Sequence, residues 1–166
     1  MIRKSCAYTI GNFVTQIEKE FATAEIIPIY KQLTADEQDA IRVVCIESLI
    51  AIVRYLTKED NQRYILPILL TLTEDKSWKV RLTIAKNFPE LANAFGKDIT
   101  DANLVAKFAL LLKDIEADVR TAAVISLKQS LKAMTVEKIQ TILLPPLSTL
   151  VQDSTFNVKG IPPRKC

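Results

Sequence analysis

The chain has 166 residues, of which 49% are apolar and 25% charged, with a net charge of +3 and no histidine. This balance is that of a folded protein, and the longest apolar stretches, such as residues 64–72, are too short to cross a bilayer. Lysines are scattered among acids, so the charge pattern does not favour nucleic-acid binding. Without histidine or a glycine-rich phosphate loop, most catalytic triads, zinc sites and general-base schemes are excluded. We therefore expect no enzyme, metal, cofactor or small-molecule substrate.

The first residues lead into no apolar signal segment, which predicts a cytoplasmic protein that could also enter the nucleus. Three cysteines are too few for a disulfide framework. Cys6 and Cys45 stand 39 residues apart and are expected to be small buried apolar side chains. Cys166 is terminal and carries no information.

Long and short amphipathic helices alternate along the chain. A long helix opens at Ile2, and a shorter one follows with Pro28 near its start, where the missing N–H costs little. After a turn at residues 36–39, the second long helix places apolar residues at intervals of 3, 1, 4, 3, 1 and 3, the stripe of a helix with one buried face. The apolar positions expected to face inward are Ile10, Val14 and Ile17 in the first helix, Ile26, Ile27, Ile29, Tyr30 and Leu33 in the short one, and Ile41, Val44, Cys45, Leu49, Ile52, Val53 and Leu56 in the second long one.

The same succession returns every 39 residues. An aliphatic–basic pair opens each long helix, and its basic residue stands at 3, 42, 81, 120 and 159. Aspartates precede the last four of these by six residues, at 36, 75, 114 and 153, and prolines share a register at 28, 67 and 145. Gly96, directly after Phe95, suits a helix C-terminus, and Phe108 and Met134 fall on apolar stripes. Such regularity predicts stacked helix pairs that bury a continuous core.

The predicted fold class is an all-α HEAT-repeat solenoid of antiparallel helix pairs. A period near 40 favours HEAT over tetratricopeptide or ankyrin units, and armadillo units would need a glycine kink that is absent. We expect one array over residues 1–159: a partial repeat at 1–22, repeats at about 23–62, 63–101 and 102–140, and a partial repeat at 141–159. Residues 160–166 are expected to be an irregular tail, because Pro162 and Pro163 oppose a helix there.

Several segments outside the bare repeat pattern carry a more specific resemblance. The chain resembles the scaffold (A, or 65-kDa regulatory) subunits of protein phosphatase 2A, a HEAT-repeat family, over about residues 2–159. The resemblance suggests a central fragment of such a scaffold. The segments that carry it are Ile26-Ile27-Pro28, Asp36-Glu37-Gln38-Asp39, Glu74-Asp75-Lys76-Ser77-Trp78-Lys79-Val80-Arg81, Val105-Ala106-Lys107-Phe108 and Glu116-Ala117-Asp118-Val119-Arg120.

The resemblance implies a non-catalytic scaffold whose turns form a ridge that binds B-type regulatory subunits and helps to position the catalytic subunit. It also implies a ladder of turn aspartates and arginines that holds the stack together, formed by Asp36, Arg42, Asp75, Arg81, Asp114 and Arg120. The candidate partner-binding residues of the turns are Glu37, Asp39, Glu74, Lys76, Trp78, Lys79, Glu116 and Asp118, within a ridge at residues 36–39, 74–79, 113–118 and 153–157.

Three alternatives accompany this interpretation. Trp78 either packs over the adjacent turn or anchors a partner, as tryptophan often does in interfaces. The charges of the turns are either a solvated face or a surface selected for electrostatic complementarity. The whole chain could instead be a generic HEAT-repeat adaptor, for example of the nuclear-transport type. HEAT-type di-iron hydroxylases need paired histidine and glutamate ligands and are excluded by the lack of histidine.

Overall fold

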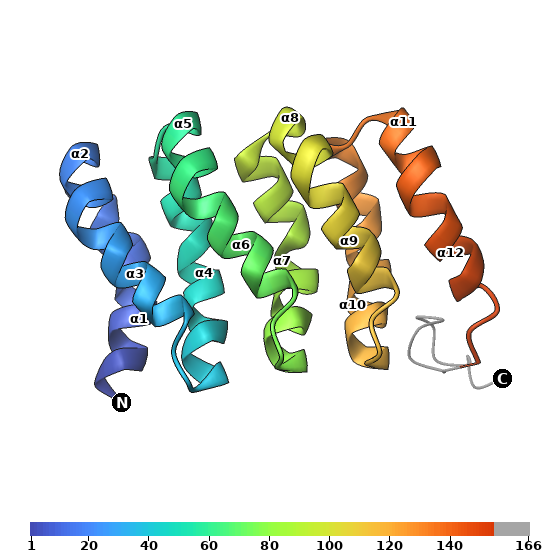
Figure 1. Cartoon of the computed structure of the whole chain (residues 1–166), viewed down its shortest axis with the longest axis horizontal. Helices are drawn as coiled ribbons and strands as arrows, with labels where there is room; N and C mark the ends of the chain where they lie inside the picture. Colours follow the sequence, from blue (N-terminus) through green and yellow to red (C-terminus); the bar gives the residue numbers. More distant parts are fainter. Residues whose placement is uncertain (155–166) are drawn as a thin grey trace, which may run out of the picture. The chain divides into compact units, whose positions relative to one another are not determined.

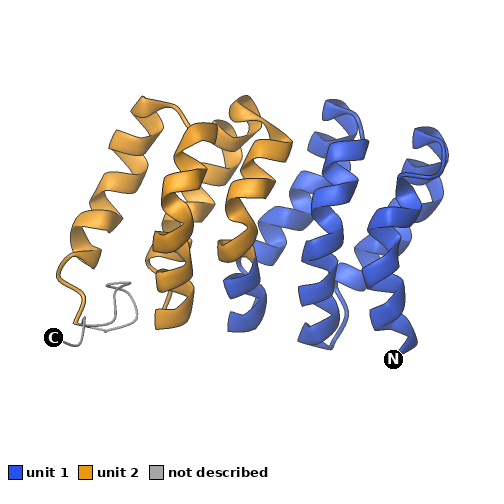
Figure 2. Cartoon of the chain, turned by 180° about the vertical axis from the view of Figure 1, so that it is seen from behind, with its two compact units in different colours: residues 1–83 blue, residues 84–166 orange. Residues whose placement is uncertain are grey.

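The computed structural model describes residues 1–154, and every regular element in that range is a helix. The predicted all-α helical-repeat solenoid is thereby confirmed. The chain, predicted as one array, divides into two compact units, residues 1–83 and residues 84–166 (Figure 2). Among the described residues, no helix combines the length and the apolar character needed to span a membrane.

Unit 1 contains helix pairs arranged in two layers. One layer is formed by α1 (Ile2–Val14), α4 (Asp39–Tyr55) and the beginning of α7 (Trp78–Phe95). The other contains two composite short helices, α2 (Lys19–Phe21), η1 (Ala22–Ile26) and α3 (Ile27–Thr34), then α5 (Lys58–Asp60), η2 (Asn61–Ile65) and α6 (Leu66–Thr73). In Figure 1 the turns from α3 to α4 and from α6 to α7 lie at one edge of this unit, opposite α2 and α5.

Unit 2 repeats the same arrangement. After the rest of α7 it contains α8 (Lys97–Ile99), η3 (Thr100–Leu104), α9 (Val105–Leu112) and α10 (Ala117–Ser130), which ends in the 3₁₀ turn η4 (Leu131–Ala133). The last short helix is formed by α11 (Val136–Lys138), η5 (Ile139–Leu143) and α12 (Leu144–Leu150). In the core of unit 2, the rings of Phe88 and Phe108 are in contact, with their centroids 4.4 Å apart. The pairs therefore begin at residues 19, 58, 97 and 136, four or five residues before the predicted repeat boundaries.

A π-helical turn stands at the same place in every short helix. The four π segments cover residues 22–26, 61–65, 100–104 and 139–143, and in the first of them the N–H of Ile27 bonds to the oxygen of Ala22, five residues back. Pro28 lies in the first turn of α3, as predicted, although helical structure already begins upstream at Lys19. The proline follows the π turn, and the π turn also forms where Ala106 replaces the proline. Proline is thus tolerated at this bend rather than required for it.

The predicted apolar stripe of α4 is confirmed, since all seven of its positions are buried. Phe108 and Met134 are buried as expected, at 0% and 3% exposure. Tyr30 is wholly buried, and its hydroxyl donates a hydrogen bond to the oxygen of Cys45 at 2.7 Å. Burial raises the pKa of the Tyr30 phenol well above its usual value and the pKa of the Cys45 thiol to about 12. Both groups are therefore neutral parts of the core.

Three positions differ from the sequence prediction. Cys6 is exposed while Cys45 is buried, because α4 is covered by α3 whereas no described helix covers the corresponding side of α1. Ile29 is 49% exposed, since Ile27, Tyr30 and Leu33 already fill the inward face of α3 and a neighbouring residue on a helix turns away from it. Ile17 lies beyond the end of α1 at Val14 and is half-buried.

Gly96 ends α7 with a φ of 86°, a left-handed conformation that suits glycine, as expected for a helix C-terminus. The predicted tail at residues 160–166, and the last part of the fourth turn, residues 155–157, lie outside the described residues.

Candidate partner-binding ridge

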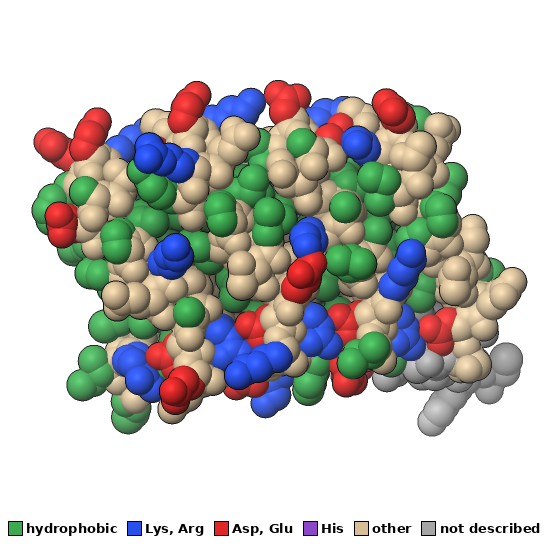
Figure 3. Space-filling model, in the orientation of Figure 1, with side chains coloured by type: hydrophobic (Ala, Val, Ile, Leu, Met, Phe, Trp, Pro, Cys, Tyr) green, Lys and Arg blue, Asp and Glu red, His purple; other side chains and the backbone are tan. Residues whose placement is uncertain are grey.

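We use the name turn ridge for the turns that join the short helix of each pair to the long one. It consists of residues 35–38 and 74–77 in unit 1 and residues 113–116 in unit 2, together with the first residues of the helices that follow. In each unit, Figure 3 shows basic and acidic side chains along the edge that carries these turns and also along the opposite edge, while hydrophobic side chains are common on the face between the two edges.

Each turn is shaped by its aspartate. The Oδ1 atoms of Asp36, Asp75 and Asp114 accept hydrogen bonds from backbone N–H groups two residues later, at 2.9, 2.8 and 2.9 Å. The aspartate thus caps the chain just before the long helix begins, where N–H groups lack helical partners. The turn has the same local geometry in three copies because this bond recurs in each.

Each turn is also held by the arginine six residues after its aspartate. Nη1 of Arg42 donates to the carbonyl oxygens of Asp36 and Glu37 at 2.6 and 3.2 Å. Arg81 and Arg120 repeat these two bonds in the next two copies, at 2.7 and 3.3 Å and at 2.7 and 3.1 Å. Two carbonyl groups that no helix satisfies therefore receive donors, which fixes the backbone of the turn.

Arginines also pair with the aspartate of the following turn. Nε and Nη2 of Arg42 each donate to one carboxylate oxygen of Asp75, both at 2.8 Å, and this pairing raises the pKa of the Arg42 guanidinium. The same contact joins Nε of Arg3 to Asp36 and Nε of Arg120 to Asp153, each at 3.1 Å. Arg3 and Asp153 were absent from the predicted ladder, although both stand in the repeat columns that define it.

Asp39 takes part in a second contact between neighbouring turns of unit 1. Its Oδ2 accepts a hydrogen bond from the hydroxyl of Ser77 at 2.9 Å. This bond is the main reason why the pKa of Asp39 lies below its usual value. Of the residues predicted to contact a partner, Asp39 is therefore the one most engaged inside the protein.

The remaining predicted contact residues lie on the surface of the ridge. Trp78 is 39% exposed at the first position of α7, and Lys79 follows it, also exposed. The other exposed members are Glu37, Glu74, Lys76, Glu116 and Asp118. The structure thus separates two sets, one of exposed residues that face outward and one of residues that hold the turns, namely Asp36, Arg42, Asp75, Arg81, Asp114 and Arg120. Binding by the second set stays a prediction.

Ile115 is a ridge residue that sequence reasoning missed. It is 87% exposed at the tip of the third turn, where the other copies carry Glu37 and Lys76. An isoleucine in a column that otherwise holds polar residues, namely Glu37, Lys76 and Ser154, was the signal that could have identified it. An exposed apolar side chain on a fixed turn is a suitable contact for a protein partner.

A rigid backbone with outward charged, aromatic and aliphatic side chains can bind a protein surface. Among residues 1–154, no group of three or more Cys, Asp or Glu residues is placed to hold a metal ion.

Comparisons with known proteins agree with this architecture. The family model described as PIK3R4-like, middle domain matches residues 2–159. Among solved structures, the chain described in "Crystal structure of Cex1p" is similar to this one, with a TM-score of 0.80 and 19% sequence identity. The match covers 96% of this chain and 30% of that chain. At this identity the likeness concerns the fold alone.

Two curated relatives are regulatory components of phosphatases. The PP2A regulatory protein of the A type from Schizosaccharomyces pombe is 30% identical over 100 residues, which cover 60% of this chain and 17% of that protein. The human serine/threonine-protein phosphatase 4 regulatory subunit 1 is 37% identical over 87 residues, 52% of this chain and 9% of that protein. The chain thus matches less than a fifth of the length of either relative, and both relatives are regulatory rather than catalytic.

Proposed function

Since this chain belongs to the PIK3R4-like middle-domain family and is similar to phosphatase regulatory subunits, we propose that it is a non-catalytic scaffold of a serine/threonine protein phosphatase of the 2A type. Its turn ridge binds B-type regulatory subunits and helps to position the catalytic subunit. The observation that carries this proposal is the ridge itself, a backbone fixed by Asp36, Arg42 and Asp75 with Trp78 and Lys79 exposed beside it.

The same ridge also supports the broader alternative, a HEAT-repeat adaptor unrelated to phosphatases. The family description names no phosphatase, and the ridge chemistry suits many protein surfaces. The identity of the captured partner distinguishes the two.

The test is a binding assay of the full chain with purified regulatory subunits of protein phosphatase 2A and, separately, with its catalytic subunit. We expect regulatory subunits to bind, and the double substitution Trp78→Ala and Lys79→Ala to weaken that binding by tenfold or more, because a buried interface tryptophan contributes about 2 kcal/mol. Helicity, measured by circular dichroism, should stay unchanged, since both side chains are exposed.

A matched control removes one exposed aromatic and one lysine at the opposite edge of unit 1. Lys19→Ala with Phe21→Ala does this on α2, where Phe21 is 53% exposed, and should leave binding intact. Equal loss in both double variants, or no loss in either, would contradict the ridge assignment. Capture of only the catalytic subunit would contradict the proposed role, and capture of neither would favour the adaptor.

A further inference from the structure

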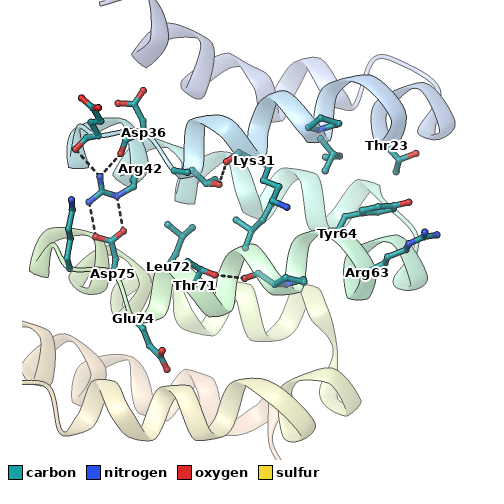
Figure 4. Close-up of a pocket in the computed structure, with 18 residues that line it drawn as sticks. Thr23, Lys31, Asp36, Arg42, Arg63, Tyr64, Thr71, Leu72, Glu74 and Asp75 are labelled. Atoms are coloured by element: carbon teal, nitrogen blue, oxygen red, sulfur yellow. Dashed lines mark hydrogen bonds and ion pairs between the residues drawn. The ribbon is translucent and has the colours of Figure 1, made fainter.

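A second surface of unit 1 has its own binding chemistry. A groove of about 940 Å³ runs between the two composite short helices of this unit. Its floor is apolar, with Ile27, Ile68 and Leu72 nearly buried beneath it, and the exposed rings of Pro28 and Pro67 line its walls. Figure 4 shows Arg63 and Tyr64 at one end, Lys31 midway and the Arg42–Asp75 pair at the other end.

The charges in the groove are unevenly distributed. The Arg42 and Asp75 charges neutralise each other at the turn end, where Glu37, Glu74 and Lys76 also line the rim. Along the rest of the groove, the only charged residues among the described lining residues are Lys31 and Arg63, both exposed and both basic. The guanidinium of Arg63 lies 5.1 Å from the centre of the Tyr64 ring, which limits where that charge can move.

These basic residues are not demanded by the repeat. Lys31 shares its column with Leu70, Ala109 and Ser148, and Arg63 shares its column with Ala24, Ala102 and Thr141. Helix pairs therefore pack in this fold without either charge. In unit 2, the pocket between α9 and α12 is about 480 Å³ and lies at the turn end, lined by residues 112–114, 120, 146, 149, 150 and 152–154. The long basic groove is a property of unit 1.

The size of the groove limits what can occupy it. Helices packed side by side have axes about 8–10 Å apart, and a helix with its side chains is about 10 Å across. The furrow between α3 and α6 can thus seat an extended chain, whereas another helix would rest only on its rim. An extended chain alternates its side chains, so apolar residues can enter the floor while polar ones reach the edges.

We infer that this groove binds an extended segment of a partner protein in which apolar residues stand beside an aspartate or glutamate that pairs with Lys31 and Arg63. The inference goes beyond the proposed scaffold function, because neither basic residue belongs to the turn ridge. The partner meets two positive charges over an apolar floor, and carboxylate–guanidinium pairs are among the stronger polar contacts.

The experiment selects a displayed library of random linear twelve-residue peptides against the full chain. Enriched peptides should combine apolar residues with Asp or Glu, and should lose about tenfold or more in affinity for the Lys31→Ala, Arg63→Ala double variant. Lys128→Ala with Lys132→Ala removes the same charge from exposed positions of unit 2 and should leave the peptides bound. Circular dichroism should show both variants equally helical.

Peptides that bind both double variants equally, a selection without acidic preference, or no selectable binder would each overturn the inference. In a further arm of the experiment, phosphoserine replaces the acidic residue of the selected peptide. If it binds more than tenfold tighter than the acidic peptide, the groove recognises a phosphopeptide and the stated partner is wrong. Regulatory-subunit binding by the ridge should be the same in the Lys31→Ala, Arg63→Ala variant, so the two surfaces can fail independently.

Discussion

Two arginines in the same repeat column show how burial determines what a residue contributes to the stability of the fold. Arg3 and Arg42 each pair through Nε with the aspartate of the next turn, at 3.1 and 2.8 Å. The Arg3 side chain is 61% exposed and the Arg42 side chain 5% exposed. Arg42 also donates to two carbonyl oxygens of its own turn, so its loss would leave several groups without partners. An exposed pair contributes little because water screens it.

We therefore expect Arg42→Ala to lower the free energy of unfolding by about 3 kcal/mol. Arg3→Ala, the matched change at an exposed position, should lower it by less than about 1 kcal/mol. Urea denaturation of both variants at neutral pH measures the difference. Equal effects of the two substitutions would mean that the buried pair does not stabilise the turn.

The Asp and Arg columns could be predicted from the sequence because their spacing repeats, but the function of each contact could not. Whether a charged side chain faces solvent or a neighbouring turn depends on what packs beside it. Asp39 accepts a hydrogen bond from Ser77, 38 positions along the chain, and nothing in the local pattern indicates that contact. Ile115 escaped notice for the same reason, since only the fold shows that it lies at an exposed tip.

At the scale of elements, a close contact between α1 and α4 depends on the absence of a side chain at Gly11. A Cβ atom at Gly11 of α1 would lie 3.0 Å from both the Cα and the oxygen of Ser48 in α4. These are backbone atoms, so no rotamer change can make room for the methyl group. Ser48 itself donates a hydrogen bond to the oxygen of Ala7 across the same interface.

Gly11→Ala should therefore destabilise the chain by about 1 kcal/mol, because overpacking costs about 1–3 kcal/mol and replacing glycine inside a helix returns at most about 1. Asn12→Ala, at the next and exposed position of α1, is the control and should cause no loss. Thermal denaturation of the two variants compares them. A Gly11→Ala variant more stable than the parent chain would show that α1 and α4 can separate without cost.

The helix types and their order could be predicted from apolar spacing, whereas the π turns could not. A π turn changes the hydrogen bonding of five residues, and the amino-acid types of those residues do not reveal that change. Proline marked the start of α3 correctly, but it gave no sign of the π turn that directly precedes that start.

At the scale of the whole molecule, the repeat explains the fold class but conceals the division into two units. The boundary between residues 83 and 84 falls inside α7, six residues before Pro89, at a point where no glycine or turn interrupts the helix. Sequence patterns report turns and buried faces, and neither changes at this point. In repeat proteins each pair contacts mainly its neighbours, so a local defect should have local consequences.

Two matched core truncations test this locality. Phe108→Ala removes a fully buried ring that contacts Phe88 in unit 2, and Leu49→Ala removes a fully buried side chain of unit 1; each substitution should cost about 2–5 kcal/mol. Hydrogen exchange followed by mass spectrometry should show faster exchange mainly in α9–α12 for the first and mainly in α1–α4 for the second. Uniform loss of protection along the chain in both variants would show that the chain unfolds as one cooperative body.

The four π turns also carry information about the ancestry of the chain. A turn closed five residues back holds one residue more than an α turn needs, so each π segment is equivalent to a single inserted residue in the short helix. The extra residue stands at the same place in all four copies, at 22–26, 61–65, 100–104 and 139–143. If one ancestral helix pair already contained the inserted residue and was then copied in tandem, a single insertion explains all four π turns. Independent origins would need four separate insertions. On the account of a single insertion, the bend is older than the duplications that built the array.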